Sequence, residues 1–132
     1  MKRTPKVGDT GRQTFVVESS HTIDIAGDPD LAVLSTPALI WFLEHAGRDA
    51  LAPLLESDET SVGVSIDVEH LAATPRGHEV NCTARIVHVD RSLITFQVMA
   101  EDSHETIARG VHKRRVVNTK RFQAHVRKKL LS

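Results

Sequence analysis

Three residues have side chains that could take part in acid–base or nucleophilic chemistry: Thr36, Glu44 and His70. Glu44 lies within an apolar stretch, and a carboxylate partly removed from water can act as a general base or as a nucleophile. The alternative is structural, because Arg48 follows four residues later, and Glu before Arg at this spacing favours an ion pair on a helix. The pattern alone leaves both interpretations of Glu44 open.

His70 follows a strand-like run in which every second residue from 62 to 68 is Val or Ile. Counting by twos places its imidazole on the apolar side of that strand. There it would be either a hydrogen-bonded core residue or an acid–base group in a pocket. Gly63, in the same run, either lets the backbone approach a ligand closely or marks a strand irregularity.

Thr36 precedes Pro37 at an expected helix start, where its side chain could simply cap the helix. The N-terminus of a helix also carries free N–H groups and positive potential. These could stabilise the oxyanion that forms when an acyl carbonyl is attacked. Thr36 therefore has both a structural and a catalytic interpretation.

The elements that would position these residues are a long apolar helix and a set of strands. The helix has a broad apolar face, extended by Trp41 and Phe42, so other structure should wrap around it. Period-two patterns predict the strands, and the basic C-terminal segment predicts a second, amphipathic helix. The expected helices span residues 37–54 and 119–132, and the expected strands span residues 13–18, 62–68, 78–89, 93–101 and 106–118.

A single early helix argues against repeated parallel βαβ units and favours an antiparallel sheet. We therefore expect an α+β protein with the hotdog fold, in which a curved antiparallel sheet wraps around a long central helix and a C-terminal helix follows. The open edge of such a sheet predicts pairing with a second copy.

Composition narrows the possible functions. A chain of 132 residues is expected to form a single domain over 1–132, and 40% apolar content excludes wholesale disorder. The lone Cys82, the absence of an apolar signal segment and the absence of a membrane-length apolar run predict a cytoplasmic protein without membrane contact. No metal cluster, dinucleotide fingerprint, phosphate loop or GxSxG elbow is present, so no metal or cofactor is expected.

Charge is unevenly distributed along the chain. Residues 18–60 contain nine acidic residues and one basic residue, whereas residues 109–132 contain nine basic residues and no acidic one. The basic end is either the solvated face of a helix or a surface for phosphates or an acidic partner. Few aromatic residues are available outside the core to stack on bases, so nucleic acid is the least favoured partner.

Four segments resemble a known family, namely residues 35–46, 61–77, 112–115 and 120–129. The most specific motif is His-x-Ala-Ala-Thr-Pro-x-Gly, which spans His70 to Gly77. From residue 7 to residue 129 the chain resembles the fluoroacetyl-CoA thioesterase-like group of hotdog thioesterases. The resemblance implies an enzyme that hydrolyses an acyl-CoA thioester to free acid and CoA and forms a homodimer. It leaves open whether dimers pair into tetramers.

The resemblance also implies roles for individual residues. Thr36, Glu44 and His70 correspond to a catalytic set in a pocket at the dimer interface, where the carboxylate attacks the thioester or activates water. Gly63 corresponds to a glycine that lines the pocket, and Arg114 corresponds to a basic residue near CoA.

Two further basic residues, Arg76 and Lys113, could hold CoA phosphates together with Arg114. The family's fluoroacetyl-specific enzyme has a longer segment before the helix, with phenylalanines that form a lid. Here Ser19–Leu34 is shorter and contains no Phe, Tyr or Trp. A different acyl group, short or medium and unfluorinated, is therefore expected. The alternative function is a non-catalytic hotdog protein that binds acyl-CoA or another ligand.

Overall fold

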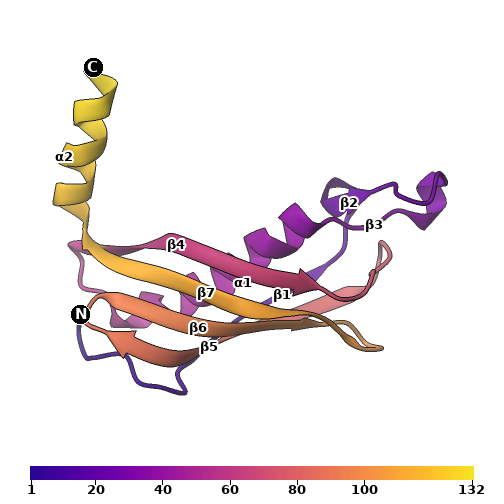
Figure 1. Ribbon diagram of the computed structural model, residues 1–132, viewed down its shortest axis with the longest axis horizontal. Coiled ribbons are helices and arrows are strands. Elements are labelled where there is room, and N and C mark those ends of the chain that lie inside the picture. The colour runs from indigo at the N-terminus through magenta and orange to yellow at the C-terminus, as the bar shows by residue number, and fades with distance from the viewer.

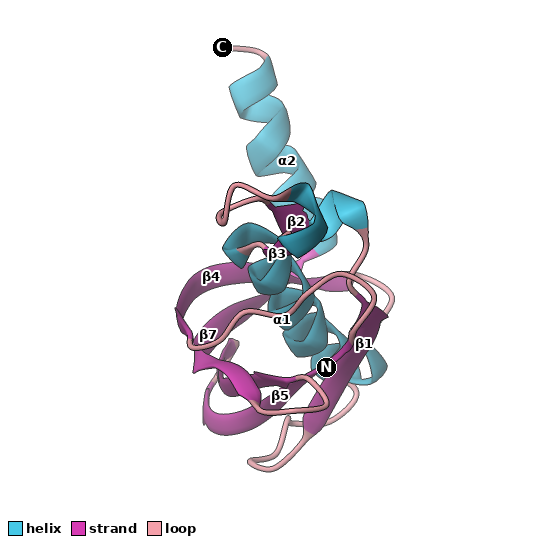
Figure 2. Ribbon diagram, turned by 90° about the vertical axis from the view of Figure 1, so that its right-hand side faces the viewer, coloured by secondary structure: helices cyan, strands magenta, loops and turns pink.

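A five-stranded antiparallel sheet forms the body of the computed structural model, which describes residues 1–132. The end-on view shows the sheet curling around helix α1 (Thr36–Leu51) (Figure 2). The strands lie in the order β1 (Thr10–Val16), β5 (Glu79–Asp90), β6 (Leu93–Glu101), β7 (Thr106–Asn118) and β4 (Glu59–His70). The expected hotdog architecture is confirmed, with β1 and β4 as its two edges.

The core lies between the sheet and α1. Alternate residues of β5 and β6 point into it and are almost completely buried, as the period-two pattern predicts. They are Val80, Cys82, Ala84 and Ile86 on β5, and Ile94, Phe96, Val98 and Ala100 on β6. From α1 the same core receives Leu39, Leu43, Ala46, Ala50 and Leu51.

Helix α1 differs from the expectation at both ends and on one face. Ser35 caps its N-terminus, and Thr36 is already helical. The α-helix ends at Leu51 and continues as the 3-10 turn η3 (Ala52–Leu54), because Pro53 has no N–H to donate. The sheet covers one side of α1 and Trp41 is 53% exposed, so the helix is wrapped less fully than expected.

Strand β4 contains a bulge that interrupts the expected alternation of inward-facing and outward-facing side chains. Gly63 pairs with Arg114 on β7, and Ser65 pairs with the next residue back, so Val64 is the extra residue. Val64 is 50% exposed and does not point inward. Beyond the bulge the alternation resumes with the expected parity, and His70 is half-buried.

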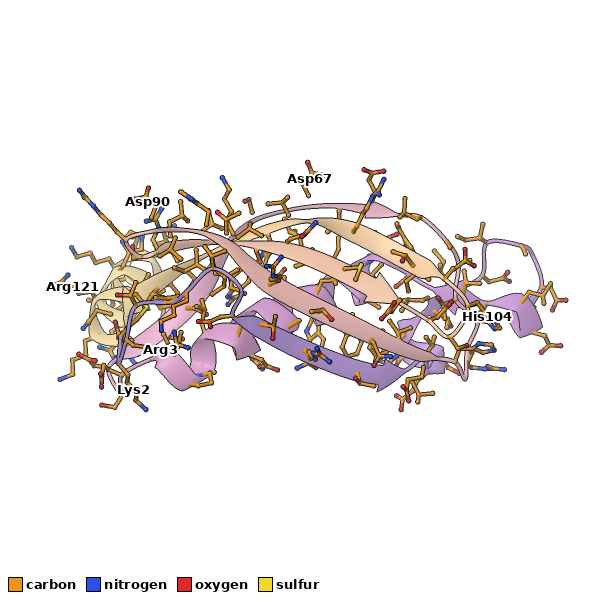
Figure 3. All side chains as sticks on the ribbon, turned by 90° about the horizontal axis from the view of Figure 1, so that it is seen from below. Lys2, Arg3, Asp67, Asp90, His104 and Arg121 are labelled. Atoms are coloured by element: carbon orange, nitrogen blue, oxygen red, sulfur yellow. The ribbon has the colours of Figure 1, made fainter.

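Two segments extend from opposite ends of this body (Figure 1). The segment before α1 contains the short strands β2 (Thr22–Ile23) and β3 (Val33–Leu34) and the 3-10 turns η1 (Ser19–His21) and η2 (Pro29–Leu31). Helix α2 (Thr119–Leu130) projects from the other end with every residue from 120 exposed. Figure 3 shows the same separation, with Arg121 on α2 far from His104 in the β6–β7 turn. Neither helix is long and apolar enough to cross a membrane.

Candidate active site

The first part of the site is a contact between the start of α1 and the end of β4. Thr36 Oγ1 lies 2.8 Å from His70 Nδ1. The capping role belongs to Ser35, whose Oγ accepts a hydrogen bond of 3.3 Å from the backbone N–H of Ala38. The Thr36 hydroxyl is therefore free to engage the imidazole, and the interpretation of Thr36 as the cap is wrong.

The imidazole of His70 is held in a partly dry environment. Burial lowers its pKa from the usual value of 6.5, and the backbone of Ala72 opposes that shift. Its Nε2 atom is shielded from solvent and makes no hydrogen bond. A neutral imidazole can accept the hydroxyl proton of Thr36 or donate to its oxygen. The pair can therefore move a proton to or from a group bound beside it.

The second part of the site surrounds Glu44, about two turns along α1 from Thr36. Glu44 Oε2 lies 3.9 Å from Nη1 of Arg114, and the carboxylate-bearing side chain is 40% exposed. Arg48 is instead 3.8 Å from Asp49. The alternative of an ion pair between Glu44 and Arg48 is therefore wrong, and the cation that faces Glu44 comes from β7.

Arg114 lies beneath this carboxylate and is only 5% exposed. Its Nε donates to Ser61 Oγ and its Nη2 to the Ser61 carbonyl oxygen, both at 3.0 Å, and Nη1 donates to His112 Nε2 at 3.3 Å. Burial lowers the pKa of Arg114, and Glu44 opposes that shift. Most of its donors are thus directed at the protein, which leaves little capacity for CoA phosphates.

Gly63 provides the space that the Glu44 carboxylate occupies. A Cβ atom at Gly63 would lie 3.1 Å from Glu44 Oε2 and 3.8 Å from Arg114 Nη1. Any side chain at this position would have to displace the carboxylate. The glycine named from the sequence therefore borders the Glu44 group.

Ser61 and His112 belong to this group of residues, and the sequence analysis did not single them out. A pattern on β7 could have identified His112. His112, Arg114 and Val116 occupy alternate positions of this strand, and all three are buried. Two charged or titratable residues on the inward-facing side of a strand are uncommon, because burying such groups requires partners.

The two remaining basic residues named from the sequence lie outside both groups. Arg76 is exposed in the turn after β4, and its Nη1 donates to Ser19 Oγ at 3.2 Å. Lys113 is half-buried on β7. Arg76 uses one of its five donors on the protein, so it can bind an anion such as a phosphate.

A single chain therefore holds two separate groups of candidate residues, Thr36 with His70 and Glu44 with Arg114, which we call half-sites. No hydrogen bond or ion pair joins one half-site to the other. The rise along α1 separates Thr36 from Glu44 by about 12 Å. The rise along β4 separates Gly63, beside Glu44, from His70 by about 23 Å.

An apolar cavity of about 380 Å³ opens beside the Thr36–His70 half-site. It lies between the segment that precedes α1 and the residues that follow β4. Besides Thr36 and His70, its walls are mainly aliphatic, and they include Ile23, Ile25, Val33, Leu34, Leu71, Ala72 and Ala73. A hydrocarbon group bound there would lie within reach of the imidazole.

This fold places the chain in the hotdog class. Similar solved structures include a hot-dog-like protein from Thermanaerovibrio acidaminovorans, with a TM-score of 0.84, 26% identity and coverage of 93% of this chain and 91% of the other. A thioesterase superfamily member from Thermus thermophilus has a TM-score of 0.87 at 23% identity, covers 96% and 93% of the two chains, and supports the fold alone.

The profile of the fluoroacetyl-CoA-specific thioesterase family matches residues 17–120. The fluoroacetyl-CoA thioesterase of Streptantibioticus cattleyicolor is 35% identical over 135 residues, covering 98% of this chain and 97% of the relative. A solved fluoroacetyl-CoA thioesterase is 34% identical, with a TM-score of 0.85 and coverage of 94% and 96%. The chain belongs to the fluoroacetyl-CoA-specific thioesterase family, a family of acyl-CoA thioester hydrolases, as the resemblance predicts.

Acidification is expected to destabilise the fold through two histidines, half-buried His70 and buried His112. Burial lowers the pKa of both His70 and His112 from 6.5. The unfolded chain therefore binds protons in a range where the folded chain does not, and the free energy of unfolding falls as the pH drops below about 6.5. Carboxyl groups whose pKa is lowered in the folded chain, such as that of Asp102, change the free energy of unfolding only at lower pH. Urea unfolding at about pH 7.5 and about pH 5.5 measures this loss, and equal midpoints would contradict it.

Proposed function

We propose that this protein hydrolyses acyl-CoA thioesters with aliphatic acyl groups, in a site that two copies of the chain build together. The observation that carries the proposal is the Thr36–His70 pair at the mouth of an aliphatic cavity. Glu44, with Arg114 beneath it, supplies the carboxylate that such hydrolysis needs.

The free edge of β4 supports assembly into a homodimer. β7 pairs with β4 on one side, and no strand pairs with it on the other. A second copy can satisfy these open backbone groups by antiparallel pairing about a two-fold axis. Asp67, labelled in Figure 3, lies on this edge and points away from the sheet.

Such pairing would also join the half-sites. If the two-fold axis passes through Asp67, Ile66 lies opposite Val68 of the second copy. Because Val64 is the extra residue of the bulge, residue 63 of one copy then lies opposite residue 70 of the other. Glu44, which borders Gly63, would then face the Thr36–His70 pair of the second copy. This register removes the separation of about 23 Å along β4 that a single chain cannot bridge.

In this site the Glu44 carboxylate either attacks the thioester carbonyl carbon or takes a proton from a water molecule that attacks it. The carbon–sulfur bond then breaks, and the CoA sulfur leaves with a proton from the Thr36–His70 pair. The water consumed in the reaction returns a proton to the pair, by way of Glu44 where the carboxylate acts as the base. After attack by Glu44 itself, water hydrolyses the resulting anhydride and restores the carboxylate. Both routes give the free acid and CoA, and Arg114 balances the carboxylate charge throughout.

The composition of the cavity indicates the class of acyl group. Ile23, Ile25 and Leu71 are 49%, 75% and 47% exposed, so aliphatic surface is available for a substrate to cover. Each buried methylene group contributes about 0.8 kcal/mol. An acyl chain of several carbons should therefore bind better than acetyl.

The lone Cys82 supports a reducing compartment such as the cytoplasm.

A panel of straight-chain acyl-CoA substrates, followed by thiol release, tests the proposal. We expect kcat/KM to rise by up to about fourfold per methylene group until the cavity is full. Tight binding of acyl-CoA without thiol release would instead identify a non-catalytic ligand-binding protein.

Filling the cavity should change this chain-length preference. Leu71→Trp places a larger side chain on the cavity wall, so we expect kcat/KM for the preferred long substrate to fall by about tenfold while that for acetyl-CoA changes little. Val87→Trp, on an exposed position of β5 that does not line the cavity, is the matched control. An equal loss for all chain lengths in Leu71→Trp would show that the acyl group binds elsewhere.

A further inference from the structure

The one fully buried histidine, His112 on β7, lies directly under helix α1. It is 1% exposed and stacks on Phe96 of β6 with ring centroids 6.1 Å apart. Its Nδ1 lies 2.8 Å from the Ser65 carbonyl oxygen, and its Nε2 lies 3.3 Å from Arg114 Nη1. A carbonyl oxygen can only accept and a guanidinium can only donate. These contacts therefore specify a neutral imidazole with its proton on Nδ1.

We propose that His112 is a positioning residue, which holds the Arg114 guanidinium in its place beneath Glu44 by accepting a hydrogen bond at Nε2. The proposal rests on the function proposed above, because Glu44 is the group that is positioned. Ser61 fixes Nε and Nη2 of the guanidinium. Only His112 fixes Nη1, which is the nitrogen nearest Glu44.

A protonated His112 could not perform this role. Protonation would replace the acceptor at Nε2 with a donor and would set a second buried cation against Arg114. The groups that face the ring are Arg114 on β7, Glu44 on α1, the Ser65 carbonyl on β4 and the Phe96 ring on β6. Burial and Arg114 lower the pKa of His112, while Ser65 and Glu44 oppose the shift. The ring is therefore neutral near pH 7.

Gly47 is the feature of α1 that allows this contact. A Cβ atom at Gly47 would lie 2.9 Å from His112 Cδ2 and 3.4 Å from Arg114 Cδ. Glycine in a helix interior is destabilising relative to alanine. Close packing of the helix on the imidazole is a physical reason to keep glycine here. Gly47→Ala should favour the helix and yet displace the ring.

The kinetic test compares substitutions that remove, retain or displace the acceptor. His112→Phe keeps a ring but has no acceptor, and we expect kcat to fall by about 10- to 100-fold with KM within about threefold. His112→Gln keeps one donor and one acceptor and should recover most of that loss. Gly47→Ala should lower kcat in the same sense as His112→Phe. His88→Gln, at an exposed position of β5, should leave both constants unchanged.

The pH profile separates this role from simple support of the fold. Protonation of His112 should remove the acceptor for Arg114 and so inactivate the enzyme, which adds one proton to the acid limb of log kcat. In His112→Gln this protonation is impossible, so the slope of the acid limb should fall by about one. An independent readout is the ¹⁵N spectrum of the wild-type imidazole, in which Nδ1 of His112 should be protonated and Nε2 unprotonated at neutral pH.

The outcomes separate this proposal from the function on which it rests. Wild-type kcat in folded His112→Phe, an unchanged acid slope in His112→Gln, or a proton on Nε2 would overturn the positioning role. If His112→Phe does not fold, the positioning role is still tested by His112→Gln, by Gly47→Ala and by the ¹⁵N spectrum. Full activity after replacement of Glu44, by contrast, would overturn the catalytic assignment whatever the His112 variants show.

Discussion

Glu44→Gln is expected to lower kcat for acyl-CoA hydrolysis by about 10²- to 10⁴-fold, with a much smaller change in KM. Gln has nearly the same shape as Glu but can neither attack a carbonyl carbon nor accept a proton from water. The fold should survive, because the side chain is 40% exposed and makes no hydrogen bond of its own within the chain. Single-turnover and steady-state thiol release, together with urea unfolding, measure activity and stability separately.

Arg48→Gln is the matched control for this substitution. Arg48 is one turn along α1, is exposed, and makes its ion pair with Asp49 instead of with Glu44. It should therefore retain the activity of the wild type. If Glu44→Gln keeps most of its rate, the carboxylate is not the catalytic group. If Arg48→Gln loses as much as Glu44→Gln, the two residues act as a pair that the structure does not contain.

The fold could be predicted from the sequence because its elements have strong patterns. Strand β6 spans the expected residues 93–101, and all four of its inward-facing residues are buried. The long apolar helix required a sheet to cover it, and short turns between strands required antiparallel pairing. The predicted side-chain directions fail where an extra residue interrupts the two-residue alternation, as at the bulge that turns Val64 outward on β4.

The site was predictable in its residue types but not in its arrangement. Thr36 follows Ser35, and both are good caps, so the sequence could not show which hydroxyl remains free for His70. The Glu44–Arg48 spacing suggested a local ion pair, but β7 brings a buried guanidinium to Glu44 from 70 residues away. Such long-range contacts depend on strand register, which residue patterns along one segment do not report.

The separation of the half-sites leads to a test with mixed dimers. Glu44→Gln and His70→Asn should each inactivate both sites of a homodimer. Coexpression with two different tags and sequential purification gives the dimer that carries one substitution in each chain. If each site takes Glu44 from one copy and His70 from the other, one site of this dimer is intact and the other carries both substitutions. We expect about half of the wild-type activity per dimer.

The reciprocal mixed dimer, which pairs a wild-type chain with a chain carrying both substitutions, should be inactive. Each of its sites would combine one intact residue with one replaced residue. If Glu44 and His70 of the same chain worked together, the results would be reversed, with no activity in the first dimer and about half in the second. The two dimers contain the same substitutions and differ only in how these are distributed. Their comparison therefore removes stability and substrate binding as explanations and reports only which copy supplies each residue.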